Sequence, residues 1–282
     1  LESTVITHGL PHPANLETAL SMEEAVRRGG ALPATIAIIG GKIHVGLDES
    51  QLEYLAGLPA QDVYKCSRRD LAVVLAKQGN GGTTVAGTMI IAHQAGIKVF
   101  ATGGIGGVHR GHPFDVSADL QELARTPVTV VCSGAKSILD LPATMEVLET
   151  NGVTLIGYQT DELPAFFARH SGLQVPARAE SPEEIAHIIA AHGRLGLQSG
   201  IVVGVPVPDG DAYDADHAEA LISQATQEAE ALDVTGAAAT PWLLNRIAEL
   251  SSGQSVEANV ALLRNNGNVA AQIAAALEDL ER

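Results

Sequence analysis

Short runs of apolar and β-branched residues alternate with helical patterns along the chain up to Pro208, and this alternation constrains the fold more than any other feature. A short, continuous apolar run bounded by glycine or a polar turn is typical of a strand that is buried on both faces. The predicted strands lie within residues 34–41, 97–104, 128–134, 153–158 and 200–207.

The segments between these runs have helical patterns, and most begin with a serine or threonine cap or with a proline in the first turn. Strands that alternate with helices favour right-handed crossovers and parallel pairing. We therefore predict an α/β fold: an αβα sandwich with a largely parallel central sheet and helices on both faces. The predicted helices are residues 67–77, 83–95, 117–124, 137–150 and 182–192.

The chain becomes alanine-rich and helical after Pro208, which predicts a helical C-terminal cap. No proline- or serine-rich linker separates this part from the rest, so we expect one domain over residues 1–282. Aromatic residues make up only 3% of the chain while 29 residues are glycine, so the core must come from small aliphatic side chains joined by tight turns.

The net charge of −16 argues against nucleic acid or an anionic membrane as the main partner. A small anionic substrate is still compatible, because local cations can outweigh the global sign. The two cysteines, Cys66 and Cys132, suggest no disulfide framework or zinc site, which favours a reducing, cytoplasmic location. The apolar runs fall far short of the roughly 20 residues that span a bilayer.

Two glycine-rich stretches stand where ligands bind in open α/β sheets, beyond the carboxyl ends of strands. "FATGGIGGVHRG" has His109 where the dinucleotide-binding motif needs its third glycine, so it does not match that motif. The stretch is either an anion or sugar site or an ordinary tight turn. "GNGGTTVAGTM" places glycines before a helix start, which predicts either an anion cradle or a capped helix after a flexible loop. It lacks the Gly-Lys-Ser/Thr of a nucleotide-triphosphate loop.

The stretch "FDVSADL" spaces Asp115, Ser117 and Asp119 two residues apart. Oxygen ligands at this spacing suit Mg²⁺ or Mn²⁺. An ordinary helix start, with Ser117 as its cap, explains the same pattern.

Two lysines stand near predicted strand and helix ends. Lys65 lies in "YKCSRRD", and Lys136 follows the strand in "TVVCSGAKS". A lysine is usually exposed, but one held at the mouth of a sheet is partly desolvated, and this lowers a lysine pKa toward the neutral nucleophile that forms Schiff bases with sugar aldehydes. Glu2 is a candidate acid or base, with a solvated terminal glutamate as the ordinary alternative.

These stretches together resemble the pseudouridine-5′-phosphate glycosidases, also called the indigoidine synthase A-like family. The resemblance runs from "ESTVITHGLPHPANLE" through "KCSRRDL", "GNGGTTVAGTM", "TGGIGGVHRG", "FDVSADLQEL" and "CSGAKSILDLPATME" to "NVALLRNN". Several long motifs in one order cover nearly the whole chain.

The resemblance implies roles for particular residues. Lys136 matches the lysine that attacks C1′ of the ribose, and Glu2 matches the proton donor. Asp115 matches the family's Mn²⁺ ligand, and Mg²⁺ suits the same oxygen ligation; how metal and substrate roles divide between Asp115 and Asp119 stays open. The other matching positions are substrate, phosphate or pocket contacts: Lys65, Val85, His109, Ser117, Ala118, Asp119 and Asn259.

The implied reaction is reversible cleavage of pseudouridine 5′-phosphate to uracil and ribose 5-phosphate by a cytoplasmic, homotrimeric lyase. The bond between C1′ and uracil C5 joins two carbons, so no leaving oxygen is available for protonation. With the ribose ring open, an amine forms an iminium at C1′ and uracil C5 takes a proton from an acid. The small residues Ser133, Gly134 and Ala135 leave room beside Lys136.

Three other functions compete with this one. A sugar kinase of the ribokinase type needs a "GAGD" anion hole, which the sequence lacks. A non-catalytic sugar-phosphate binding module needs the glycine turns but not Lys136 and Glu2 together. A related sugar-phosphate lyase or a role in pigment synthesis uses the same bond chemistry.

Overall fold

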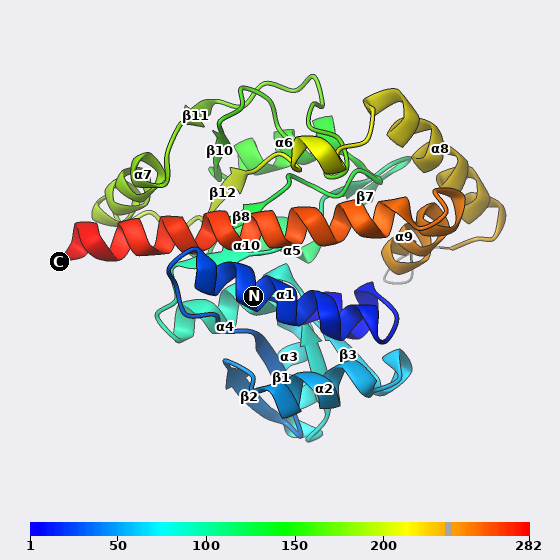
Figure 1. The fold of residues 1–282 in the computed structure, drawn as a ribbon, viewed down its shortest axis with the longest axis horizontal. Coiled ribbons are helices and arrows are strands. Elements are labelled where there is room, and N and C mark those ends of the chain that lie inside the picture. Colours follow the sequence, from blue (N-terminus) through cyan, green and yellow to red (C-terminus); the bar gives the residue numbers. More distant parts are fainter. Residues whose placement is uncertain (235–238) are drawn as a thin grey trace.

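A parallel five-stranded sheet forms the centre of the computed structural model, which describes residues 1–234 and 239–282 (Figure 1). Its strand order is β11-β10-β12-β8-β5, and every neighbouring pair in it is parallel. Four of the predicted runs supply four of these strands, so the parallel central sheet is confirmed. The strands are β5 (Val99–Ala101), β8 (Thr129–Cys132), β10 (Thr154–Tyr158), β11 (Ala177–Ala179) and β12 (Ile201–Gly204).

Helices cover both faces of this sheet, as predicted. Because side chains alternate along a strand, Val130 of β8 packs with one helical layer and Val131 with the other. The first layer contains α4 (Val85–Gln94), α5 (Ala118–Leu123) and α6 (Leu141–Thr150). The second contains α7 (Pro182–Arg194) and α10 (Gln254–Glu281).

A second sheet holds the first predicted strand, which corrects the expectation of one central sheet. Its order is β2-β1-β4-β3, with β1 antiparallel to both of its neighbours and β3 parallel to β4. Gly40 and Gly41, both at positive φ, form a two-residue turn that sends the chain back along β1. The strands are β1 (Ile36–Ile39), β2 (Lys42–Val45), β3 (Val63–Cys66) and β4 (Asn80–Thr83).

The predicted helices form close to their expected positions, with two differences. The glycine-rich stretch before α4 is strand β4 and not a flexible loop, and Thr84 caps the helix by accepting from Gly87 N at 3.2 Å. The helix predicted from residue 137 begins at Leu141, because residues 139–140 form β9 against β6 (Val108–His109), which also pairs with β7 (His112–Val116). Helices α1 (Ala14–Arg28) and α2 (Glu49–Gly57) were not predicted. Helix α3 (Arg68–Ala76) begins directly after its predicted cap.

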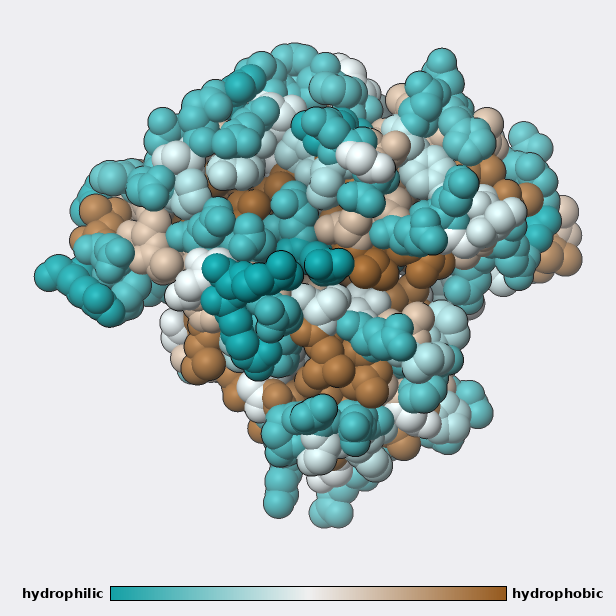
Figure 2. All heavy atoms as spheres, in the orientation of Figure 1, coloured by the Kyte–Doolittle hydropathy of each residue, from teal (hydrophilic) through white to brown (hydrophobic). Residues whose placement is uncertain are grey.

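The C-terminal part is helical, as predicted, but its last helix belongs to the core. Helices α8 (Ala215–Ala231) and α9 (Ala239–Leu250) lie at one side, whereas α10 crosses the middle of the view next to α1 (Figure 1). It packs against α1, α7 and the strands β5 and β8. Hydrophilic side chains cover most of the face in Figure 2. Among the described residues, no helix has the length and apolarity needed to cross a membrane.

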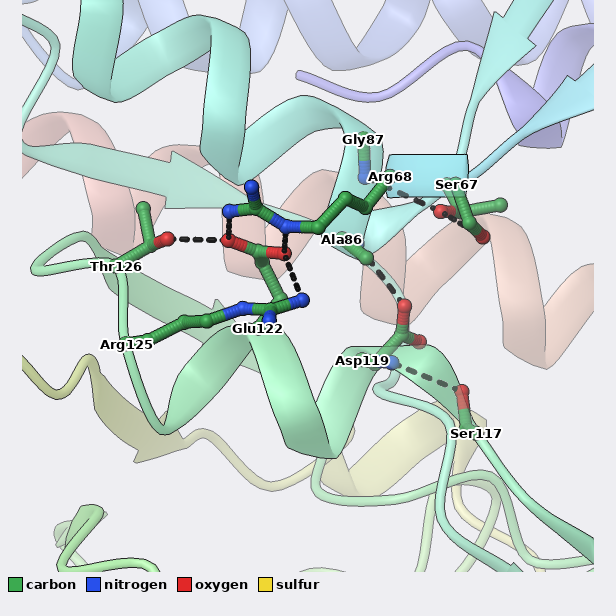
Figure 3. Close-up of polar contacts among 10 residues, drawn as sticks. Ser67, Arg68, Ala86, Gly87, Ser117, Asp119, Glu122, Arg125 and Thr126 are labelled. Atoms are coloured by element: carbon green, nitrogen blue, oxygen red, sulfur yellow. Dashed lines mark hydrogen bonds and ion pairs between the residues drawn. The ribbon is translucent and has the colours of Figure 1, made fainter. Parts of the chain in front are cut away.

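An ion pair between a half-exposed arginine and a buried glutamate connects the small sheet to the large one (Figure 3). Arg68 of α3 donates two hydrogen bonds, of 2.7 and 2.6 Å, to the fully buried carboxylate of Glu122 on α5. Arg125, at 3.3 Å, and the Thr126 hydroxyl also donate to it. Burial acts to raise the pKa of Glu122, but the hydrogen bonds from Arg68 and Thr126 outweigh it and hold this pKa below its usual value.

Replacing Arg68 with alanine is expected to lower the free energy of unfolding by about 2 kcal/mol, since it leaves a buried carboxylate with fewer donors. Urea unfolding at neutral pH measures the loss. The matched control is Arg69→Ala at the next position, where an exposed arginine lies 3.6 Å from Asp70, and its change should stay within about 0.5 kcal/mol. Equal stabilities of the two variants would contradict a role for the ion pair.

Candidate active site

The loops that leave β5 and β8 pair with each other beyond the carboxyl edge of the large sheet. Ser133 N donates to Gly103 O at 2.9 Å, and Ile105 N donates to Gly134 O at 3.1 Å. Lys136 N then donates to Ile105 O at 3.1 Å. The two exit loops, residues 102–106 and 133–136, therefore form one rigid unit, and the half-buried Lys136 is fixed at its end.

Only glycine fits at the centre of the β8 exit loop. Gly134 has φ +77°, and a Cβ there would lie 2.0 Å from the carbonyl oxygen of Pro164. Phe166 N donates to Ser133 O at 3.0 Å from the same neighbouring segment. The turn that carries Lys136 is thus packed on its far side as well.

Glu2 is held against the β5 exit loop. The Thr102 hydroxyl donates to Glu2 Oε1. The neighbouring Ser3 is buried, donates to Ile36 O at 2.7 Å and accepts from Thr83 N at 2.8 Å. These bonds attach the segment around Glu2 to the small sheet while its carboxyl group points to the large one.

The electrostatics of Glu2 show which charges surround it. Burial raises the pKa of this carboxyl, whereas the positive charges of Lys136 and Lys65 and the Thr102 hydrogen bond oppose the rise; Asp119 adds to it. The effect of burial is the largest of these, so the pKa of Glu2 lies above its usual value. A carboxylic acid with a raised pKa keeps its proton at a higher pH and can donate it.

Lys65 joins this cluster from the small sheet, on β3. Burial and the neighbouring charge of Lys136 lower the pKa of Lys65, against the opposing effects of Asp119 and Glu2. Four charged residues that are far apart in the sequence therefore meet at the carboxyl edge of the large sheet: Glu2, Lys65, Asp119 and Lys136.

Both carboxylate oxygens of Asp119 accept hydrogen bonds from backbone amides. Oδ1 accepts from Ala86 N and Oδ2 from Gly106 N, both at 2.9 Å. Figure 3 shows Asp119 at the start of α5, where Ser117 caps the helix by accepting from Asp119 N at 3.2 Å. Asp119 thus joins the first turn of α4, at the buried Val85, to the β5 exit loop.

The remaining predicted residues lie beside this cluster or away from it. His109 and Asp115, on the β6–β7 hairpin, line a cavity of about 100 Å³ with Thr226 and Leu243. Burial lowers the pKa of His109, and the neighbouring charges of His112, Lys65 and Lys136 act in the same direction, while Asp115 opposes the change. Ala118 is exposed at the start of α5.

Asn259 is half-buried near the start of α10. No hydrogen bond joins it to the charged cluster within the described residues. The place of Asn259 in the site therefore stays a prediction.

A metal at Asp115 has to be held largely by groups other than protein side chains. In the described ranges, no group of three or more His, Cys, Asp or Glu side chains is arranged to hold a metal ion. Mg²⁺ and ions like it are commonly bound by one or two carboxylates together with substrate phosphate and water. A single carboxylate, Asp115, fits that mode and does not fit a closed protein site.

Three supporting residues escaped the sequence analysis: Thr102, Arg110 and Asn266. Arg110 donates to Ser137 O at 2.9 Å and to Leu139 O at 3.1 Å, which braces the chain just after Lys136. Thr102 and Asn266 do stand in the quoted motifs "TGGIGGVHRG" and "NVALLRNN", and that is the only signal a sequence offers. Their partners are 100 residues or more away in the sequence.

Fold and site together define a class: an α/β protein in which ionisable side chains of both signs converge beyond the carboxyl ends of parallel strands, as in enzymes that bind small molecules. The model of the family described as indigoidine synthase A like protein matches residues 1–276. The chain belongs to this family.

Curated relatives and solved structures agree with this assignment. Proteins named pseudouridine-5′-phosphate glycosidase from Caldanaerobacter subterraneus and Herpetosiphon aurantiacus are 54% and 56% identical to it, over 99% and 98% of this chain and 91% of each relative. An indigoidine synthase A-like protein from Thermotoga maritima matches with a TM-score of 0.91 and 38% identity, covering 100% of this chain and 92% of that one. The prealnumycin C-glycosynthase, solved with ribulose 5-phosphate, matches with a TM-score of 0.90 and 40% identity, covering 99% and 91%.

The two acidic residues of "FDVSADL" are expected to differ in their effect on stability. Asp119→Asn puts an amide donor against a backbone N–H, so the free energy of unfolding should fall by about 1–3 kcal/mol. Asp115→Asn removes the same charge where the described structure has no carboxylate hydrogen bond, and its change should stay within about 0.5 kcal/mol. Chemical denaturation measures both, and a loss confined to Asp115→Asn would refute the bracing role of Asp119.

Proposed function

We propose that this protein cleaves, reversibly, the C1′–C5 bond of pseudouridine 5′-phosphate to give uracil and ribose 5-phosphate. The observation that carries the proposal is that Thr102 holds Glu2 against the β5 exit loop, which pairs with the β8 exit loop that carries Lys136. A binding module would need neither a nucleophile nor a protonated acid at this place. The names of the relatives at 54–56% identity support the same substrate.

Lys136 supplies the nucleophile. Its nitrogen bonds to C1′ as the ribose ring opens, and the ring oxygen leaves as the 4′-hydroxyl. Glu2 then gives its proton to C5 of uracil. As the C1′–C5 bond breaks, its electron pair restores the C5=C6 double bond of uracil, and the nitrogen lone pair forms the C1′ iminium. Water hydrolyses the iminium, which releases ribose 5-phosphate and leaves Lys136 as an ammonium group. This ammonium gives a proton back to the Glu2 carboxylate, so that the free amine and the protonated acid are both restored.

The other residues bind the end of the substrate that does not react. Lys65 offers positive charge to the phosphate, and Val85 N is the amide at the start of α4 that neither Asp119 nor Thr84 occupies. Asp119 fixes this turn through Ala86 N, and Ser117, Ala118, His109 and Asn259 complete the proposed pocket. Binding energy from the phosphate holds the flexible opened sugar in place for the chemistry.

Asp115 would hold Mn²⁺, or Mg²⁺ in its place, with phosphate and water as further ligands. When bound, the ion neutralises phosphate charge. We propose a homotrimeric, cytoplasmic protein, in line with the relatives that the sequence resembles.

A second candidate is the synthesis of a carbon–carbon bond between a pentose phosphate and an aromatic acceptor. The similarity to prealnumycin C-glycosynthase favours it, and the reaction is the reverse of the same chemistry. The higher identity to the glycosidases, 54–56% against 40%, places cleavage of pseudouridine 5′-phosphate first.

The direct test is covalent trapping. Incubation with ribose 5-phosphate, uracil and Mn²⁺, followed by borohydride reduction, should add one pentose phosphate to Lys136, as located by intact and peptide mass. Lys136→Ala should form no adduct and lose at least about a thousandfold in kcat, because the nucleophile itself is gone. Its thermal unfolding should match that of the wild type. An active Lys136→Ala would reject the Schiff-base assignment.

The pH profile tests the role of Glu2. If protonated Glu2 is the acid, kcat falls as pH rises through its pKa, which burial places above the usual value. The Thr102 hydrogen bond lowers this pKa, so Thr102→Val should raise it and move the alkaline limb to higher pH. Thr126→Val is the control, because that buried hydroxyl also donates to a carboxylate, Glu122, away from the cluster. A limb that stays in place or moves to lower pH in Thr102→Val counts against the assignment.

A further inference from the structure

One fully buried amide side chain, that of Asn266 on α10, contacts both exit loops. Its Nδ2 donates to Thr102 O at 2.9 Å and to Ser133 Oγ at 3.1 Å. The Ser133 hydroxyl also lies 3.3 Å from Asn266 Oδ1. Helix α10 thus holds the first residue of each exit loop, Thr102 and Ser133.

Each of the two residues that Asn266 contacts is linked directly to a residue of the proposed reaction. Thr102, whose carbonyl Asn266 holds, uses its hydroxyl to hold Glu2. Ser133, whose hydroxyl Asn266 holds, begins the turn that ends at Lys136. The two loops therefore receive their relative position from backbone pairing and from this single side chain.

The surroundings of Asn266 make a general packing role a poor explanation. Leu262, Leu263 and Ile273 of the same helix are buried and apolar. A buried amide is costly unless its partners satisfy it, and an aliphatic residue would fill such a position without that cost. The amide is well placed for specific geometry, since its Nδ2 donates to both exit loops and its Oδ1 accepts from one of them.

We propose that Asn266 is a positioning residue that sets the distance between the acid Glu2 and the nucleophile Lys136. The inference rests on the proposed function, in which these two residues act on the two ends of one C–C bond. Asn266 is buried and acts through Thr102 and Ser133. It contacts no substrate atom.

Kinetics of Asn266→Asp provide the test, with Asn265→Asp as the matched control. Asn265 is the next residue on α10, and its Nδ2 donates to Pro206 O at 3.3 Å, away from the exit loops. A misplacement of reacting groups by about 1 Å can cost on the order of a hundredfold, so kcat for pseudouridine 5′-phosphate should fall about 10- to 100-fold in Asn266→Asp. KM should change by less than about threefold, because the phosphate contacts lie elsewhere. Asn265→Asp should keep the wild-type kcat.

The variant Ser133→Ala is a second and less disruptive test of the positioning role, because it introduces no buried charge. It removes one hydroxyl on the Lys136 side, so borohydride trapping should slow by a factor of about 3 to 10 while the alkaline limb of the pH profile stays in place. Asn266→Asp should slow trapping and also move that limb to higher pH, because it loosens Thr102. A purely structural role would lower the melting temperature without this separation.

The outcomes separate this inference from the proposed function. Wild-type kcat and pH profile in a folded Asn266→Asp overturn the positioning role, and if that variant does not fold, wild-type trapping in Ser133→Ala overturns it. If the wild-type protein cleaves the substrate and Lys136→Ala forms no adduct, such a failure concerns Asn266 alone. If the wild-type protein neither cleaves nor forms an adduct, the proposed function and the positioning role both fail.

Discussion

The pairing of the two exit loops beyond β5 and β8 is the constraint on which the rest of the site depends. Parallel strands bring their carboxyl ends to one edge, but they do not fix the path of the chain beyond that edge. Here three backbone hydrogen bonds extend the pairing past the strands and end at the amide of Lys136. A long, flexible lysine side chain is useful as a nucleophile only when its base is held in this way.

The short helix α5 does similar work between the two sheets. One end holds the first turn of α4 and the β5 exit loop through Asp119, and the other holds α3 through Glu122 and Arg68. Lys65 leads directly into α3 from the small sheet. The positions of the two lysines relative to each other thus depend on carboxylates that need not touch a substrate.

The sequence alone predicted those parts of the fold that are buried on both faces. The runs that became β8 and β12 are continuously apolar because helices cover both sides, and such runs are easy to recognise. Strands β3 and β4, with the sequences "VYKC" and "NGGT", carry polar and glycine residues and owe their pairing to neighbours far along the chain. The small sheet was missed for that reason.

For the site, the resemblance of motifs identified positions, and the structure shows that Glu2, Lys65, Asp119 and Lys136 meet. Their chemical roles, the metal at Asp115, the homotrimer and the single domain remain predictions. The contacts of Thr102 and Asn266 could not have been predicted, because each exists only after distant segments have packed.

The long helix α10 packs against the large sheet although it follows all five strands of that sheet in the sequence. On the ribosome, the strands and the loop of Lys136 emerge well before it, so both exit loops lack the Asn266 contact until residue 266 has been made. A partly made chain therefore carries Lys136 on a loop that lacks this contact. The geometry of the site is a late product of folding and appears only when α10 has packed against the exit loops.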